Sequence, residues 1–180
     1  MTKYNLYTHY KKILADTITP VSIYLKIRDK FQNSILLESS DYHANDNSFS
    51  YICFNPIAFI KVENQKIETS FPNGFSEIIP IDSAVNVAKE IENFSNKFQI
   101  EKSNFKFITQ GLFGYMAYDA IQYFEKVSIE KKSKENEIPE IYYAVYQNII
   151  AINHFKNEAY LFCHSYNDNN NIAEIEQLLQ

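Results

Sequence analysis

The sequence contains no tryptophan, three glycines, five prolines and two cysteines. It also lacks a clustered basic stripe, since Arg28 is the only arginine and the net charge is −5. This balance argues against a broad nucleic-acid-binding surface, because phosphate recognition needs clustered Lys and Arg. The chain has neither an N-terminal signal-peptide pattern nor an uncharged apolar run long enough for a transmembrane helix. We therefore expect a soluble, cytoplasmic protein.

The two cysteines, Cys53 and Cys163, lie far apart, each inside an apolar, strand-like run. Such positions are typical of buried free thiols in a reducing compartment. Their spacing does not exclude a disulfide.

Aromatic residues are abundant instead: the 180 residues include 14 Tyr and 14 Phe, and 46% of the chain is apolar. This length suits one ordinary domain with a substantial core, to which large rings contribute much of the buried area. The pattern of short helical and alternating segments predicts an α+β fold with mainly antiparallel sheet and outer helices, formed by residues 1–180 as a single domain.

Helical spacing is found in four places. A helix should begin at Thr19-Pro20, where Thr can cap and Pro fits the first turn. Others are expected from Asp82 or Ser83, after Gly114, and over residues 172–180. The last of these presents Ile172, Ile175 and Leu179 on one face, which needs a partner surface; we expect the chain to continue in a longer protein.

Strands are predicted from apolar alternation and turn signals. Pro56 should end one of them or set it at an edge, and residues 63–66 should form a hairpin turn. Residues 4–15 suit a strand or a helix, and the charged stretch 126–139 suits a surface loop. The predicted strands are 35–37, 48–54, 57–62, 105–108, 141–155 and 158–166.

Titratable residues form no recognisable catalytic set. The four histidines lack metal-ligand spacing with Cys or acidic residues, and no nucleophile elbow occurs. Asp41 and Asp46 near Glu38 could form a cation site, but an acidic turn is the simpler interpretation. The sequence therefore offers no self-contained catalytic centre and no metal site.

The segment from Ser34 to Ser50 places a carboxylate and hydroxyls, Glu38, Ser39 and Ser40, directly after an apolar strand. Such residues commonly cap the turn at a strand end. They would also suit a pocket for a small zwitterion. The residues alone leave both interpretations open.

A second segment, from Gly111 to Asp119, reads GLFGYMAYD. Its two glycines permit close backbone approach or positive φ, and a following helix would bring Tyr115, Tyr118 and Asp119 together. A phosphate-binding loop is excluded because the full glycine pattern and its Gly-Lys-Ser/Thr ending are absent. From the residues alone, this is a strand-to-helix corner with packed tyrosines.

Leu-Leu-Glu-Ser followed after ten residues by Ser50 resembles the N-terminal region of anthranilate synthase component I. The resemblance implies that Glu38, Ser39 and Ser50 belong to a tryptophan feedback site. Phe49 stands where relatives often carry Lys, so one polar contact of that site is in doubt; Phe49 could instead flank the indole.

The GLFGYMAYD segment similarly resembles the Gly-x-x-Gly-Tyr-x-x-Tyr-Asp signature shared by the large subunits of anthranilate synthase and aminodeoxychorismate synthase. There it helps to join the N-terminal part to the chorismate-binding part. The resemblance therefore assigns Gly111, Gly114, Tyr115, Tyr118 and Asp119 to a domain interface.

The resemblance implies an enzyme that takes ammonia from a glutamine amidotransferase partner, component II, and converts chorismate to anthranilate and pyruvate. Its chorismate and Mg²⁺ chemistry would reside in a C-terminal part beyond these residues, so the chain alone should be inactive. Two alternatives stay open: the aminodeoxychorismate synthase large subunit and a free-standing amino-acid-binding module.

Overall fold

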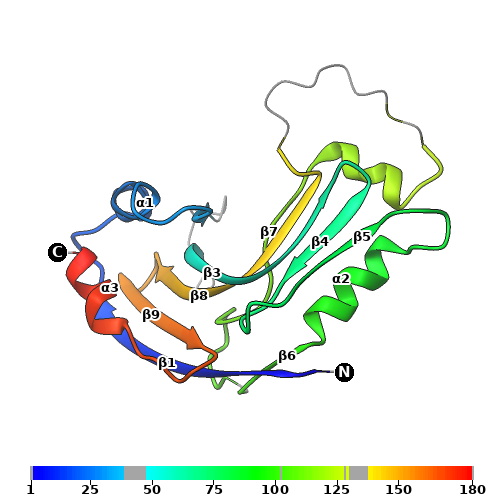
Figure 1. Cartoon of the computed structure of the whole chain (residues 1–180). Helices are drawn as coiled ribbons and strands as arrows, with labels where there is room; N and C mark the ends of the chain where they lie inside the picture. The colour runs from blue at the N-terminus through cyan, green and yellow to red at the C-terminus, as the bar shows by residue number, and fades with distance from the viewer. Residues whose placement is uncertain (1, 39–47, 102, 128, 130–137, 180) are drawn as a thin grey trace. The chain divides into compact units, whose positions relative to one another are not determined.

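The computed structural model describes residues 2–38, 48–101, 103–127, 129 and 138–179. Within these ranges the chain forms nine strands, three α-helices and one 3-10 helix (Figure 1). The strands are β1 (Tyr4–Leu14), β2 (Ile35–Leu37), β3 (Phe49–Glu63), β4 (Lys66–Ser70), β5 (Ser76–Pro80), β6 (Phe98–Ile100), β7 (Phe113–Met116), β8 (Ile141–Asn153) and β9 (Glu158–Ser165). The helices are α1 (Pro20–Arg28), α2 (Val87–Ser95), the 3-10 helix η1 (Tyr118–Tyr123) and α3 (Ile172–Leu179).

The chain divides into two compact units. The α2 unit comprises Met1–Lys3, Ile57–Phe98 and Leu112–Val145, and the α1–α3 unit comprises Tyr4–Pro56, Gln99–Gly111 and Tyr146–Gln180. The long strands β3 and β8 each contribute residues to both units. The strand pairs whose register is defined are antiparallel, which confirms the predicted α+β class with mainly antiparallel sheet.

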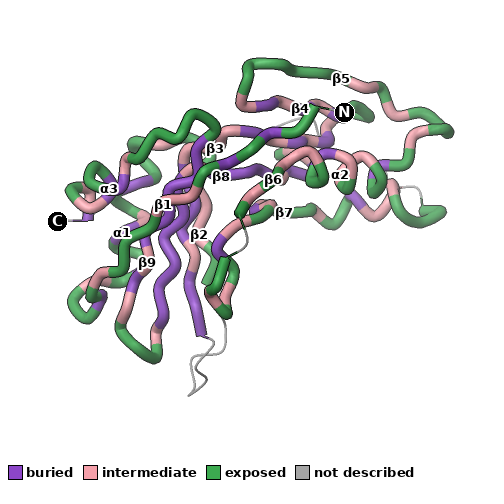
Figure 2. The backbone as a smooth tube through the Cα atoms, turned by 90° about the horizontal axis from the view of Figure 1, so that it is seen from below, coloured by how far each residue is buried: buried purple, intermediate pink, exposed green. Residues whose placement is uncertain are grey.

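In the α1–α3 unit, β8 lies between β3 and β9, and β1 pairs with the other edge of β9. Helix α3 packs against β9, β1 and α1 (Figure 1). One face of the sheet and the two helices share a buried cluster, which Figure 2 marks as purple stretches of the strands. Its largest members are Ile23, Ile27, Ile52, Phe54, Ile150, Ile152, Leu161, Ile172, Ile175 and Leu179. The apolar face of α3 is therefore covered within the chain.

Helix α1 begins as predicted. Thr19 accepts a hydrogen bond from the Ser22 backbone N–H at 3.1 Å, and the Thr19 N–H donates to the Ser22 hydroxyl at 3.2 Å. This reciprocal capping box, with Pro20 at the first position, satisfies two backbone donors that a helix leaves unpaired at its start.

In the α2 unit, β4 lies between β5 and β3, and β7 pairs with β8. The predicted hairpin at residues 63–66 is confirmed, with Asn64 and Gln65 both at positive φ. Three aromatic rings of this unit, Phe71, Phe94 of α2 and Phe98, contact one another. The ring centroids are 5.4 Å apart for Phe71–Phe94 and 5.2 Å apart for Phe94–Phe98. These rings hold α2 to the unit.

Several predicted boundaries are wrong. Pro56 does not end its strand: β3 runs through it, and Asn55 just before it adopts a left-handed φ of 58°. Helix α2 begins at Val87, because Asp82 accepts the Ala84 N–H in a turn and Asn86 provides the cap instead. Residues 105–108 form no strand; their aromatic side chains pack on the sheet from an irregular segment.

Both cysteines are free and buried, as predicted. Burial raises the pKa of the Cys53 thiol, so this group stays protonated and behaves as a small apolar side chain. Within the described ranges, no helix has the length and apolar character needed to cross a lipid bilayer.

Candidate functional site

The strand end singled out by the sequence lies in the α1–α3 unit, where β2 pairs with β3. The last pair of this ladder joins Leu37 to Tyr51. Glu38 follows Leu37 and Ser50 precedes Tyr51, so the two residues stand one step beyond this pair, on neighbouring strands. Directly opposite residues of an antiparallel pair share a sheet face. The register therefore leads Glu38 and Ser50 out of the same end of the β2–β3 ladder.

Glu38 and Ser50 differ sharply in exposure. Glu38 is exposed, whereas Ser50 is only 1% exposed. The Ser50 hydroxyl Oγ lies 2.7 Å from Nε2 of His154, which directly follows the end of β8. Ser50 is thus held from inside the unit, and Glu38 is the group that a molecule arriving from solvent would meet.

Phe49 does not join this pair, because successive side chains of a strand point to opposite faces. Ser50 shares the face of Ile52 and Phe54, which the helices cover. Phe49 lies on the other face, stacked on Phe107 with ring centroids 4.5 Å apart, and 6.1 Å from Tyr51. An indole flanked by Phe49 would therefore lie on the face opposite to the Ser50 hydroxyl.

Ser39, Ser40, Asp41 and Asp46 lie outside the described residues. Among the residues that are described, no group of three or more His, Cys, Asp or Glu side chains could hold a metal ion.

The GLFGYMAYD segment does not form the predicted helix. Gly111, with a φ of 140°, belongs to the α1–α3 unit, and residues 112–119 belong to the α2 unit. Phe113–Met116 is strand β7, and the 3-10 helix η1 begins only at Tyr118. A Cβ atom built on Gly114 would come within 1.9 Å of the Tyr142 carbonyl oxygen on the paired strand. Gly114 is therefore required by the close approach of β7 to β8.

The tyrosines of this segment are not packed as the residues alone predicted. Tyr118 is 83% exposed and Asp119 is exposed. Tyr115 is 36% exposed and stacks on Tyr142 with ring centroids 6.2 Å apart. Desolvation raises the pKa of both the Tyr115 and the Tyr142 hydroxyl, so both stay neutral near pH 7.

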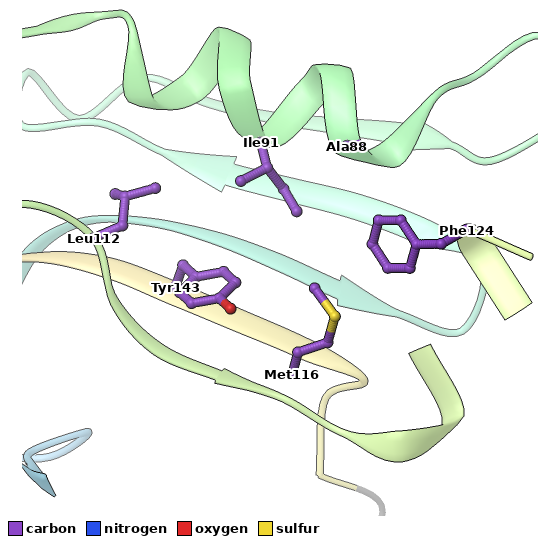
Figure 3. A pocket seen from close by; sticks show the side chains of 6 residues that line it. All are labelled: Ala88, Ile91, Leu112, Met116, Phe124 and Tyr143. Carbon is purple, nitrogen blue, oxygen red and sulfur yellow. The ribbon is translucent and has the colours of Figure 1, made fainter. Parts of the chain in front are cut away.

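An apolar cavity of about 360 Å³ opens beside this segment (Figure 3). Figure 3 shows Ile91 of α2 pointing toward the side chains of the opposite wall. Two lining residues, Met116 and Phe124, are 44% and 41% exposed. The full lining is Ala88, Ile91, Leu112, Met116, Phe124 and Tyr143.

A second cavity, of about 280 Å³, lies in the α1–α3 unit. Tyr10, Phe105 and Phe162 form its aromatic wall, and Glu101 contributes a carboxylate. Phe162 pairs with Ile149 and belongs to the sheet face of Phe107, not to the helix-covered face of Ser50. This cavity is therefore separate from the strand-end pair.

Comparison with known proteins decides the family. Residues 32–180 match the model of the chorismate binding enzymes. The chain belongs to this chorismate-binding enzyme family. Among curated relatives, anthranilate synthase component 1 of Lactococcus lactis is 29% identical over 152 residues, which are 84% of this chain and 31% of that protein. The protein of the same name from Aquifex aeolicus is 28% identical over 127 residues, 69% of this chain and 24% of that protein.

A solved structure of a protein with this name has a similar fold. The crystal structure of anthranilate synthase component I from Streptococcus pneumoniae aligns with a TM-score of 0.51 and 22% identity, covering 94% of this chain and 35% of that one. The chain thus spans about a third of the length of these relatives.

The sequence did not connect His154 with the strand end. Its Nε2 lies 2.7 Å from the Ser50 hydroxyl. The two residues are 104 positions apart, and no local spacing could have joined them.

Proposed function

We propose that this chain is the N-terminal, tryptophan-sensing part of anthranilate synthase component I. The observation that supports the proposal is the β2–β3 register, which leads Glu38 and Ser50 out of the same end of the ladder, in a chain similar to proteins named anthranilate synthase component 1. The complete enzyme, a cytoplasmic lyase of tryptophan biosynthesis, would convert chorismate and ammonia to anthranilate, pyruvate and water. A glutamine amidotransferase subunit, component II, would supply the ammonia.

In this proposal the chain regulates and does not catalyse. The family resemblance implies that the Mg²⁺ ligands belong to the C-terminal part of the complete enzyme, and the described residues of this chain include no cluster of metal-ligating side chains. We therefore assign no catalytic step to this chain, which is expected to be inactive alone. The segment with Gly111, Gly114, Tyr115, Tyr118 and Asp119 would contact the catalytic part, since Tyr118, just after the paired strand β7, is 83% exposed.

The proposed recognition of tryptophan uses charge and hydrogen bonding. The exposed Glu38 carboxylate would oppose the α-ammonium group, and Ser39 would donate to the α-carboxylate. Ser50, buried at 1% exposure, would hold the strand end from inside rather than meet the ligand directly. A charge-assisted contact of this kind contributes about 1.5 to 3 kcal/mol.

Removal of the Glu38 charge tests the proposal. In the complete enzyme, Glu38→Gln should raise the tryptophan concentration for half-inhibition at least about tenfold, which corresponds to about 1.4 kcal/mol. Ser39→Phe should abolish the inhibition. Anthranilate formation would be measured fluorimetrically with and without tryptophan, which also verifies the product against aminodeoxychorismate.

Glu77→Gln provides the matched control, because Glu77 is an exposed carboxylate on β5 in the α2 unit. It should leave the inhibition curve of the parent unchanged. Superimposable curves for Glu38→Gln, Ser39→Phe and the parent would refute the proposed site.

A further inference from the structure

His154 holds the buried hydroxyl of Ser50. Its Nε2 lies 2.7 Å from Ser50 Oγ, and its backbone N–H donates to the Ser48 carbonyl at 3.1 Å. His154 therefore ties both the backbone and a side chain at the start of β3.

The surroundings explain why a polar partner is needed there. Ser50 shares its sheet face with Ile52 and Phe54, and the neighbouring strand presents Ile150 and Ile152 on that face. A hydroxyl at 1% exposure among such side chains has little access to water. Leaving a buried hydroxyl without a partner costs about 1–3 kcal/mol. A leucine at position 154 would suit the apolar surroundings but would leave this hydroxyl unpaired.

The position of this hydrogen bond gives it a consequence outside the core. Ser50 stands one step beyond the Leu37–Tyr51 pair, as does Glu38 on the neighbouring strand. Because β2 pairs with β3 up to Leu37 and Tyr51, a hydrogen bond that holds the start of β3 also restrains the backbone just before Glu38. A shift of about 1 Å in a binding group is enough to weaken a charge-assisted contact, because such contacts need short distances and good alignment.

We propose that His154 is a positioning residue of the effector site: through its hydrogen bond to Ser50 it holds the strand end in the geometry that binds the amino acid. The inference rests on the proposed function, since it deepens the account of the same site. His154 does not touch the effector in this arrangement. Its side chain acts on the strand end through the Ser50 hydroxyl.

This route predicts non-additive substitutions, which a merely structural role would not give. In the complete enzyme, His154→Leu and Ser50→Ala should each raise the tryptophan concentration for half-inhibition about five- to tenfold. The double variant should match Ser50→Ala alone, because the second change removes a bond that is already lost. His154→Gln retains an N–H donor at the end of its side chain, and it should keep half-inhibition within about twofold of the parent.

Inhibition curves, the uninhibited kcat and KM for chorismate, and the melting temperature would be measured for all four variants. Equal effects of His154→Leu and His154→Gln, or additive effects in the double variant, would overturn the inference. So would a His154→Leu effect that appears only in the melting temperature. If His154→Leu does not fold, the inference is tested by His154→Gln and Ser50→Ala. It requires His154→Gln to keep the sensitivity to tryptophan and Ser50→Ala to reduce it. The proposed function fails separately, when Glu38→Gln leaves inhibition unchanged.

Discussion

The two units use the same pair of long strands but cover them differently. In the α1–α3 unit, two helices close over one sheet face, and Ile23, Ile27 and Ile175 are at most 1% exposed. In the α2 unit a single α-helix lies on the sheet, and the cavity next to it leaves Met116 and Phe124 more than 40% exposed. The two helices of the α1–α3 unit exclude water from the sheet face that they cover, whereas α2 leaves part of the apolar surface beside it exposed. The first unit can therefore hold a buried hydroxyl such as that of Ser50, which lies 2.7 Å from Nε2 of His154, and the second presents apolar surface.

The largest effect that we expect concerns the strand pair of the more open unit. Gly114→Ala would place a methyl group 1.9 Å from the Tyr142 carbonyl oxygen, so β7 must separate from β8. This backbone clash cannot be relieved by a side-chain rotation. The free energy of unfolding should fall by about 4 kcal/mol or more. Urea denaturation followed by circular dichroism measures it.

Gly74→Ala is the control for that experiment. Gly74 has a φ of +81° but nothing within 4 Å of an added Cβ. Its substitution should cost only the left-handed strain of about 1–2 kcal/mol. Equal losses for the two alanine variants would contradict the close approach of β7 and β8.

The difference in side-chain burial between the two units can be measured by replacing one isoleucine with alanine in each. Ile175→Ala removes a side chain that is 1% exposed between α3 and the sheet, and it should cost about 3 kcal/mol. Ile91→Ala acts on a half-buried side chain at the rim of the α2 cavity. It should cost about 1 kcal/mol, because a half-exposed side chain gives up less apolar burial. A loss at Ile91 as large as that at Ile175 would remove the distinction between the units.

The smallest effect concerns His164, a buried histidine of the α1–α3 unit. His164 is 1% exposed, with Nε2 2.8 Å from the Thr109 carbonyl oxygen and Nδ1 2.9 Å from the Thr8 hydroxyl. Desolvation lowers the pKa of His164 below its ordinary value of 6.5. The folded state therefore keeps the ring neutral while the unfolded state binds a proton, so stability is full above pH 6.5 and is lost as the pH falls below it.

The loss attributed to His164 should be at most about 1.4 kcal/mol per pH unit. Comparison of the unfolding free energy of the parent and His164→Gln at pH 7 and pH 5 isolates it, since Gln does not titrate. Parallel pH profiles for the two proteins would show that His164 does not carry this dependence.

Much of the fold could be predicted because the decisive signals are local. The Thr19-Pro20 cap and the Asn64-Gln65 turn each lie within a few residues. The start of α2 could not be predicted so well, since Asp82 and Asn86 both suit a cap and only the folded chain selects Asn86. Residues 105–108 alternate like a strand, but their rings reach the sheet without backbone pairing.

The candidate site divides in the same way. Glu38 and Ser50 were found because one short segment carries both residues and resembles a family. The opposite orientation of Phe49 follows from strand alternation, yet it becomes evident only when Ser50 is known to face the helices. His154 depends on the pairing of β3 with β8, which is a property of the sheet and not of any local motif.

The sharing of β3 and β8 has a consequence for how this chain can be divided. Each unit is assembled from three separate stretches of sequence, so no single cut between neighbouring residues releases either one intact. A cut at any single peptide bond therefore divides at least one of the two units between the resulting fragments.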